Sequence, residues 1–239
     1  MRETTMTTII GPELLGRTVD HDPRNKDHPF PVRSVAKPVS KTWGIQAPIL
    51  DQGKIGSCEG NTAIEWLNTD IAVKNRKRST FKSHDAQGFL NEIDAVQVYS
   101  KATHLDEDKA EAYPPTDCGT SALGIAKAMK FFKAIDSYTW SFGWDHFTAA
   151  IDHGPVMLGT NWYAGMFHPT KDGFVEISGD VQGGHAYLAR GIDYENQRVL
   201  CRNHWGTDWG LEGEFYLSFA TLQRLLKEQG DVLVPTLLA

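Results

Sequence analysis

The segment Gln52-Gly53-Lys54-Ile55-Gly56-Ser57-Cys58 decides how the rest of this chain is interpreted, because it places a thiol shortly after a side-chain amide. Two later segments supply what a cysteine nucleophile needs. Gly183-Gly184-His185 carries an imidazole, and Asn203-His204-Trp205-Gly206 carries a second amide. An imidazole can take the proton of a thiol, an amide oxygen can fix the tautomer of that imidazole, and amide N–H groups can stabilise an oxyanion. These residue types indicate covalent catalysis by Cys58.

These segments resemble the papain family of cysteine peptidases. The nucleophile stretch of that family has the form Q-x-x-x-G-S-C, which residues 52–58 match at each fixed position. His185 and Asn203 follow Cys58 at close to the family interval of roughly 130–150 residues. Residues 203–210 resemble the family motif N-S-W-G-x-x-W-G, with histidine where serine is usual. Looser likeness is found at residues 117–121 and 154–156, within a similarity that spans roughly Trp43 to the C-terminus.

The resemblance implies a role for each of these side chains. Cys58 would be the nucleophile and His185 the general base and acid. Asn203 would orient His185, and Trp205 would shield their hydrogen bond from water. Gln52 would donate to the oxyanion together with the backbone N–H of Cys58. The resemblance implies no metal and no organic cofactor.

The substrate-binding residues follow from the same resemblance. Gly119 and Thr120 would offer their backbone to an extended peptide. Gly159, Gly184 and Ala186 lack large side chains, and this predicts an open pocket for an apolar side chain beside the nucleophile. The expected partner is a peptide or protein substrate.

The chain departs from the family pattern in three ways. Ile55 stands where secreted relatives carry a disulfide cysteine. Glu59 places a carboxylate directly after the nucleophile, which would raise the pKa of the thiol unless that carboxylate is paired or points away. Only about 50 residues precede Gln52, fewer than the inhibitory prosegment of secreted relatives. We therefore expect no autoinhibition of that kind, as in compact bacterial or bacteriophage-type versions of the family.

The composition excludes several other classes of protein. The net charge is −6 and no long basic run is present, which argues against nucleic acid as the main partner. The N-terminal ten residues lack an apolar signal core, and no segment reaches the length of a membrane span. These features predict a cytoplasmic protein, with association with a virion as an alternative. The oligomeric state does not follow from the sequence, and a monomer is compatible with it.

The three cysteines, Cys58, Cys118 and Cys201, are too few for a disulfide scaffold. Cys201 lies in an apolar run and is predicted to be a small buried residue. The acidic clusters at residues 20–22 and 106–108 lack the spacing of a metal site and are interpreted as solvated charge. We interpret His204 as an exposed neighbour of Asn203.

The pattern of apolar residues predicts an α+β protein, and the resemblance implies a papain-like two-lobed fold with the site in the cleft between the lobes. An extended N-terminal arm covers residues 1–42, and a peptidase domain covers 43–239. The helical lobe spans about 52–145, and the lobe with a barrel-like antiparallel sheet spans about 146–239. The expected helices are 57–71, 95–101, 121–133 and 220–228. The expected strands are 156–158, 174–177, 186–190, 199–202, 214–217 and 232–234, and 74–77 is expected to be an exposed connection.

Two other functions compete with a cysteine endopeptidase. A catalytically silent module could use the same cleft to bind a peptide, and Glu59 is the residue that favours this alternative. A thiol amidase or transacylase would keep the chemistry and act on another amide. Slow labelling of Cys58 by a thiol-reactive inhibitor would favour the silent module.

Overall fold

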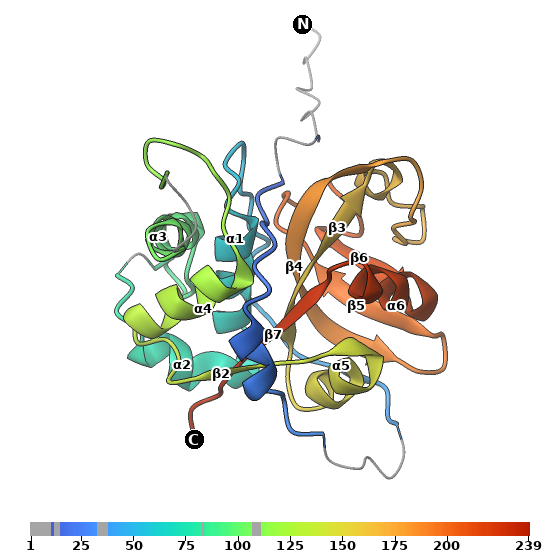
Figure 1. Cartoon of the computed structure of the whole chain (residues 1–239), viewed down its shortest axis with the longest axis horizontal. Coiled ribbons are helices and arrows are strands. Elements are labelled where there is room, and N and C mark those ends of the chain that lie inside the picture. The colour runs from blue at the N-terminus through green and yellow to red at the C-terminus, as the bar shows by residue number, and fades with distance from the viewer. Residues whose placement is uncertain (1–10, 12–14, 33–37, 83, 107–110) are drawn as a thin grey trace, which may run out of the picture.

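The computed structural model describes residues 11, 15–32, 38–82, 84–106 and 111–239. Two lobes stand side by side, one helical and one built on a sheet (Figure 1). The helical lobe contains α1 (Cys58–Leu67), α2 (Val73–Arg78), α3 (Glu92–Thr103) and α4 (Ala122–Phe131), with the short 3-10 helix η3 (Asp70–Ala72). The expected α+β, two-lobed architecture is confirmed.

The second lobe is an antiparallel sheet with two helices and a short 3-10 helix, η4 (Ala164–Phe167). The strand order is β2-β7-β3-β4-β5-β6, and β1 (Lys41–Thr42) pairs with β4. The strands are β2 (Tyr138–Trp140), β3 (Val156–Tyr163), β4 (Val181–Asp193), β5 (Arg198–Arg202), β6 (Glu214–Ser218) and β7 (Asp231–Pro235). The helices α5 (Gly143–Ile151) and α6 (Phe219–Lys227) complete this lobe.

The central strands supply both hydrophobic cores because their side chains alternate between the two faces of the sheet. Met157, Leu188 and Leu233 belong to the core of the helical lobe. Their neighbours in the sequence (Leu158, Tyr187 and Val232) belong to the core of the sheet lobe. The three strands β3, β4 and β7 therefore join the lobes rigidly.

Helix α1 is buried along its whole length, which fixes the position of its first residue, Cys58. Ser57 is the N-cap residue, but its hydroxyl donates to Asn61 Oδ1 at 2.8 Å instead of capping the helix. Gly60 allows close approach to α3, because a Cβ there would overlap Ala95 O. The nucleophile candidate thus lies at the end of a helix that has no freedom to shift.

Two of the element predictions are wrong. Residues 74–77 form part of α2 rather than an exposed connection. Asn75 of this helix is buried, and its Nδ2 donates to Ala134 O at 2.9 Å and to Thr236 O at 3.0 Å. Residues 174–177 are not a strand; Phe174 forms only an isolated bridge with Tyr216. The other predicted helices and strands are present, with shifted ends.

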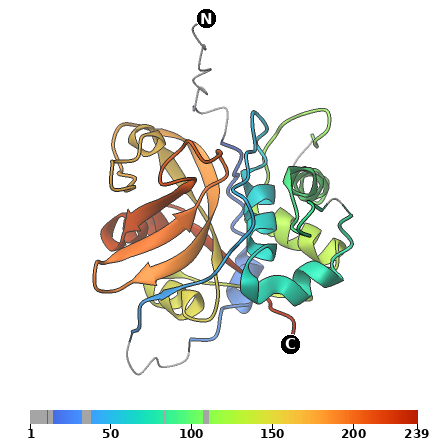
Figure 2. The same ribbon diagram turned by 180° about the vertical axis from the view of Figure 1, so that it is seen from behind.

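The N-terminal segment does not stay on the outer surface. From Leu15 it runs between α1 and β4, in the middle of the molecule in both views (Figures 1 and 2). It then forms the 3-10 helix η2 (Pro23–Asp27), and Phe30 N donates to Trp140 O at 2.7 Å. Much of the predicted arm, residues 1–10, 12–14 and 33–37, lies outside the described residues.

Candidate active site

Cys58 is completely buried at the start of α1. Its thiol interacts with the backbone N–H groups of Ala186, Gly16 and Glu59. Burial raises the pKa of Cys58 to about 12, and the charge of Glu59 adds to this effect, although the three N–H groups oppose it. The thiol is therefore held protonated in this arrangement.

His185 is held from one side by Asn203. His185 Nε2 and Asn203 Oδ1 are 2.8 Å apart, and both residues are completely buried. Because an amide oxygen only accepts, Nε2 carries the hydrogen and Nδ1 has the lone pair. Nδ1 has no hydrogen-bond partner among the described residues. Since the backbone of the next residue, Ala186, interacts with the thiol, the base and the nucleophile candidates lie in the same part of the cleft.

Trp205 covers the imidazole, with its ring centroid 4.6 Å from that of His185. Trp162 packs against the same ring at 4.8 Å, edge to face. Burial lowers the pKa of His185 well below its usual value, and the neighbouring His204 adds to this effect. The imidazole and the thiol are thus both uncharged in this structure.

Gln52 is fixed beside this pair by Trp205, whose indole Nε1 donates to Gln52 Oε1 at 3.1 Å. Gln52 Nε2 donates to Ile55 O at 2.6 Å, and the backbone N–H of Gln52 donates to His204 O at 3.0 Å. The loop before α1 is therefore tied to the segment after β5, which brings the amide of Gln52 next to Trp205, the residue whose ring covers His185.

The predicted substrate-binding backbone is occupied by the chain itself. Thr120 N donates to Gly16 O at 2.8 Å, and Thr18 N donates to Thr120 O at 2.9 Å. On the other lobe, Arg17 N donates to Gly184 O at 3.1 Å. Gly119 has a φ of +66°, and a Cβ on it would overlap Gly16 O. Residues 15–18, which we call the strap, therefore lie across Cys58, contrary to the expectation that no N-terminal segment blocks the cleft.

The strap places a basic side chain in the pocket that the sequence assigns to an apolar one. Arg17 Nη2 donates to Asp231 Oδ2 at 2.5 Å and to Gln229 O at 2.6 Å. Gly159 pairs with Ala186 on one side and with Asp231 on the other. A Cβ on Gly159 would overlap the guanidinium of Arg17. The side chain found near Cys58 is thus a cation.

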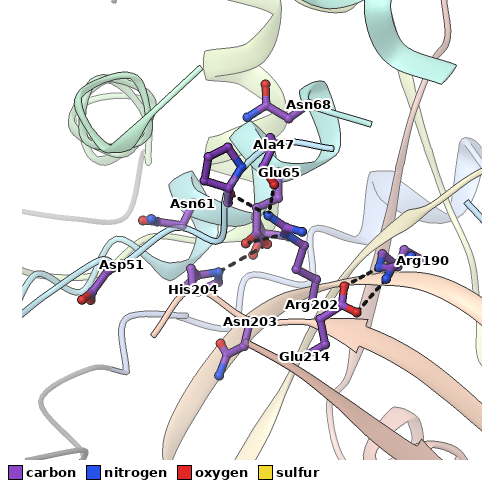
Figure 3. Close-up of polar contacts among 12 residues, drawn as sticks. Ala47, Asp51, Asn61, Glu65, Asn68, Arg190, Arg202, Asn203, His204 and Glu214 are labelled. Atoms are coloured by element: carbon purple, nitrogen blue, oxygen red, sulfur yellow. Dashed lines mark hydrogen bonds and ion pairs between the residues drawn. The ribbon is translucent and has the colours of Figure 1, made fainter. Parts of the chain in front are cut away.

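A second buried polar cluster links the two lobes behind Asn203 (Figure 3). The side chains of Arg202 and His204 both point to Glu65 of α1, with Arg202 Nε 3.5 Å from Oε1 and His204 Nδ1 3.6 Å from Oε2. Burial raises the pKa of Glu65 to about 8, although Arg202 opposes the shift. Burial lowers the pKa of His204 to about 3. The interpretation of His204 as an exposed residue is wrong.

All ten predicted site residues lie along this cleft, and their chemical roles stay predictions. The sequence analysis missed Arg17, Asp231 and Glu65. Arg17 belongs to no motif, and Glu65 is one charged residue within a helix. Asp231 offered a weak signal, because it is a carboxylate at the start of the apolar run Val232-Leu233-Val234.

The sequence also makes predictions about the cysteines, the possible metal ligands and the lengths of the helices. Cys58, Cys118 and Cys201 form no disulfide, and Cys201 is buried. Within the described ranges, no group of three His, Cys, Asp or Glu side chains could hold a metal ion. In the same part of the chain, every helix is too short or too polar to cross a bilayer.

Comparison with known proteins gives a consistent result. Residues 39–227 match the sequence model described as papain family cysteine protease. An uncharacterized peptidase C1-like protein of Acanthamoeba polyphaga mimivirus is 26% identical over 201 residues, covering 71% of this chain and 64% of that protein. Cysteine proteinase 3 of Solanum lycopersicum is 28% identical over 208 residues, covering 76% and 56%. The chain thus spans less than two thirds of the length of these curated relatives.

Solved structures show the same fold. Xylellain, a cysteine protease from Xylella fastidiosa, superposes with a TM-score of 0.58 at 20% identity, covering 97% of this chain and all of that one. Procathepsin L2 from Tenebrio molitor gives 0.51 at 18% identity, covering 94% and 79%. Because these relatives come from a virus, a plant, a bacterium and an insect, the bacterial or bacteriophage type stays a prediction.

Proposed function

Since this chain belongs to the papain family of cysteine proteases, we propose that it is an endopeptidase that hydrolyses peptide bonds through Cys58, His185 and Asn203. The observation that carries the proposal is the set of contacts around the imidazole. Asn203 holds Nε2 at 2.8 Å, and the backbone of the adjacent Ala186 interacts with the thiol of Cys58. This leaves Nδ1 as the nitrogen that can take the thiol proton.

In the first half of the reaction, a peptide replaces the strap. The carbonyl carbon of the bond to be cleaved then lies next to the sulfur of Cys58. The proton of the thiol moves to His185 Nδ1, and the sulfur forms a bond to the carbonyl carbon. The negative charge on the oxygen is stabilised by N–H groups of Gln52 and of the Cys58 backbone. His185 then gives its proton to the leaving amine as the C–N bond breaks.

In the second half, water hydrolyses the thioester of Cys58. His185 takes a proton from the water as the new bond to carbon forms, and returns a proton to the sulfur as the thioester breaks. Asn203 and the covering ring of Trp205 keep the imidazole in one orientation through both halves. Every step uses side-chain and backbone groups of this chain and one water molecule.

The test is labelling with a peptidyl epoxide, read by mass spectrometry, together with cleavage of a protein substrate. Both are measured in the full chain and in Gly16→Ala, whose added methyl would overlap Gly56 O and displace the strap. We expect Cys58 to be the labelled residue, and Cys58→Ser and His185→Ala to lower cleavage by at least about a hundredfold.

Cys118→Ser is the matched control, because Cys118 is half-buried and has no place in the mechanism. It should leave cleavage unchanged. Equal labelling of Cys58 and Cys118, with no cleavage in either the full chain or Gly16→Ala, would contradict the proposal and favour the silent binding module.

A further inference from the structure

Arg17 is the one residue of the strap whose long side chain is almost completely enclosed, with 5% of its surface exposed. Its guanidinium is anchored at three points. Nε and Nη2 donate to Asp231 Oδ2 at 3.2 and 2.5 Å, and Nη2 also donates to Gln229 O at 2.6 Å. The strap therefore fills a pocket that offers a carboxylate and a carbonyl at its end.

The walls of this pocket are built from the body of the protein. Gly159 of β3 pairs with Asp231 of β7, so the carboxylate lies directly beside a residue with no side chain. A Cβ on Gly159 would overlap both Arg17 and Asp231 Oδ1. A Cβ on Gly184 would overlap Arg17 O. Two positions without side chains therefore keep open the space that leads to Asp231.

The location of the pocket relates it to the reaction. Gly16, directly before Arg17 in the strap, interacts through its backbone with the thiol of Cys58. Arg17 itself pairs with Thr120 and donates its N–H to Gly184 O. A peptide bound by the same backbone groups would have one of its residues at Cys58. The side chain of the adjacent residue would then enter this pocket.

The charge of Asp231 limits what can replace Arg17. Its side chain is nine-tenths buried, and a buried carboxylate is costly unless it is paired with a cation and hydrogen-bonded. The nearby charge of Glu59, which also acts on Arg17, increases the negative potential. An apolar side chain would leave Asp231 buried without a cation, so it would bind worse than a basic one.

We propose that this pocket selects a basic side chain of the peptide substrate and prefers arginine over lysine. The selected side chain belongs to the residue adjacent to the one whose carbonyl is attacked by Cys58, and Asp231 determines this specificity. The proposal rests on the peptidase function proposed above. Arginine fits better than lysine because its planar guanidinium can bind Asp231 Oδ2 and Gln229 O at once, as Arg17 does.

The experiment uses the full chain with Arg17→Ala, which empties the pocket, and the double variant Arg17→Ala with Asp231→Asn. Internally quenched peptides carry arginine, lysine or norleucine at one position at a time, over three positions on each side of the cleaved bond. We expect arginine to raise kcat/KM over norleucine by at least about tenfold at the position adjacent to the residue whose carbonyl is attacked. In the double variant this ratio should fall to near one, while cleavage of the norleucine peptide is retained.

Each other outcome has a defined meaning. If cleavage occurs but no position prefers arginine, or the preference persists in the double variant, the pocket inference is overturned and the peptidase function stands. If no peptide is cleaved and Cys58 is not labelled, the peptidase function fails. Calorimetry then measures the binding of arginine and norleucine peptides that differ at this one position to the Arg17→Ala variant, and this tests the pocket inference. Tighter binding of arginine by at least about tenfold that depends on Asp231 supports the inference, and equal binding overturns it.

Asp231→Asn keeps the size of the side chain, so its folding can be checked against Arg17→Ala by thermal unfolding. Glu195→Gln serves as the matched control, since it removes one exposed negative charge in the turn between β4 and β5 and should leave the arginine preference unchanged.

Discussion

Cys58 shows how strongly the surroundings of one side chain govern its reactivity. A thiolate is the nucleophilic form, and a cysteine at the start of a helix is normally favoured as thiolate. Here, burial and Glu59 outweigh that effect and raise the pKa of Cys58 to about 12. The covered cleft therefore holds the thiol of Cys58 in its protonated form.

The pH dependence of alkylation tests this view. With a pKa of about 12, the thiolate fraction of Cys58 in the closed chain rises with pH throughout the range from 6 to 9. The rate of labelling by iodoacetamide should rise about tenfold per pH unit. Peptide mapping by mass spectrometry in the Cys118→Ser variant separates the signal of Cys58 from that of Cys201, because the two cysteines lie far apart in the sequence. A rate that is already constant at neutral pH would indicate a preformed thiolate and contradict this reading.

At the level of single residues, the motif segments identified Cys58, His185, Asn203 and Gln52 because each carries a group with specific chemistry at a recognisable spacing. Arg17 could not be found in this way. Its role depends on a pairing with Asp231, which is more than two hundred residues away in the chain. Such a contact leaves no local pattern in the sequence.

At the level of elements, α1 and the end of β5 are joined by the buried cluster of Glu65, Arg202 and His204. This connection ties the helix that begins at Cys58 to the strand end that leads to Asn203 (Figure 3). Arg202 also donates to Ala47 O at 2.7 Å and to Pro48 O at 2.6 Å. The guanidinium is therefore held even without the carboxylate of Glu65.

Glu65→Gln should flatten the pH dependence of stability. The pKa of Glu65 is raised from 4.5 to about 8, so the folded state retains a proton that the unfolded state loses above pH 4.5. The stability from this group is fully present below pH 4.5 and is lost as the pH rises towards 8. The slope is up to about 1.4 kcal/mol per pH unit.

The measurement is the free energy of unfolding by urea between pH 5 and 8. Glu65→Gln should lose less stability over this range than the unmodified chain, while Glu195→Gln, which removes an exposed carboxylate, should behave like the unmodified chain. Parallel pH curves for all three proteins would show that Glu65 does not titrate in this window.

The elements that the sequence predicted are those with a clear apolar period. Helices α3 and α4 carry buried apolar residues at helical spacing, and the predicted strands are the apolar runs within β3 to β7. Helix α2 has the sequence VKNRKR with only Asn75 buried, so no period marks it. Residues 174–177 have the composition of a strand, but their contact with a neighbouring strand is limited to Tyr216, through a single bridge and the bond from Val175 N to Tyr216 O.

For the whole molecule, the strap acts as a connection between the two lobes. It is hydrogen-bonded to Thr120 on the helical side and to Gly184 on the sheet side. A pocket of about 420 Å³ remains beside it, lined by strap residues, by Asp117 to Gly119 and by Gln182 to Gly184. The strap therefore fills only part of the cleft.

Gly16→Ala should release the strap without unfolding the protein. The new methyl would overlap Gly56 O, so the bonds of Thr18 N and Thr120 N should open. Hydrogen exchange at these two amides should accelerate by at least about tenfold, while the amides of α1 remain protected. Gly154→Ala is the control, since a Cβ there meets only Ile71 Cδ1 at 3.0 Å and Leu237 Cδ1 at 3.9 Å. Unchanged exchange in Gly16→Ala would show that the strap tolerates the methyl.

Because the strap is covalently part of the chain, dilution does not remove it from the cleft. Its effective concentration at the pocket is on the order of millimolar, as for other tethered ligands. A peptide at micromolar concentration therefore competes with an intramolecular occupant. Its apparent affinity equals its affinity for the open cleft multiplied by the fraction of molecules in which the cleft is open. Any protein or surface that binds residues 15–18 more tightly than the cleft does would open the cleft to a peptide at unchanged peptide concentration.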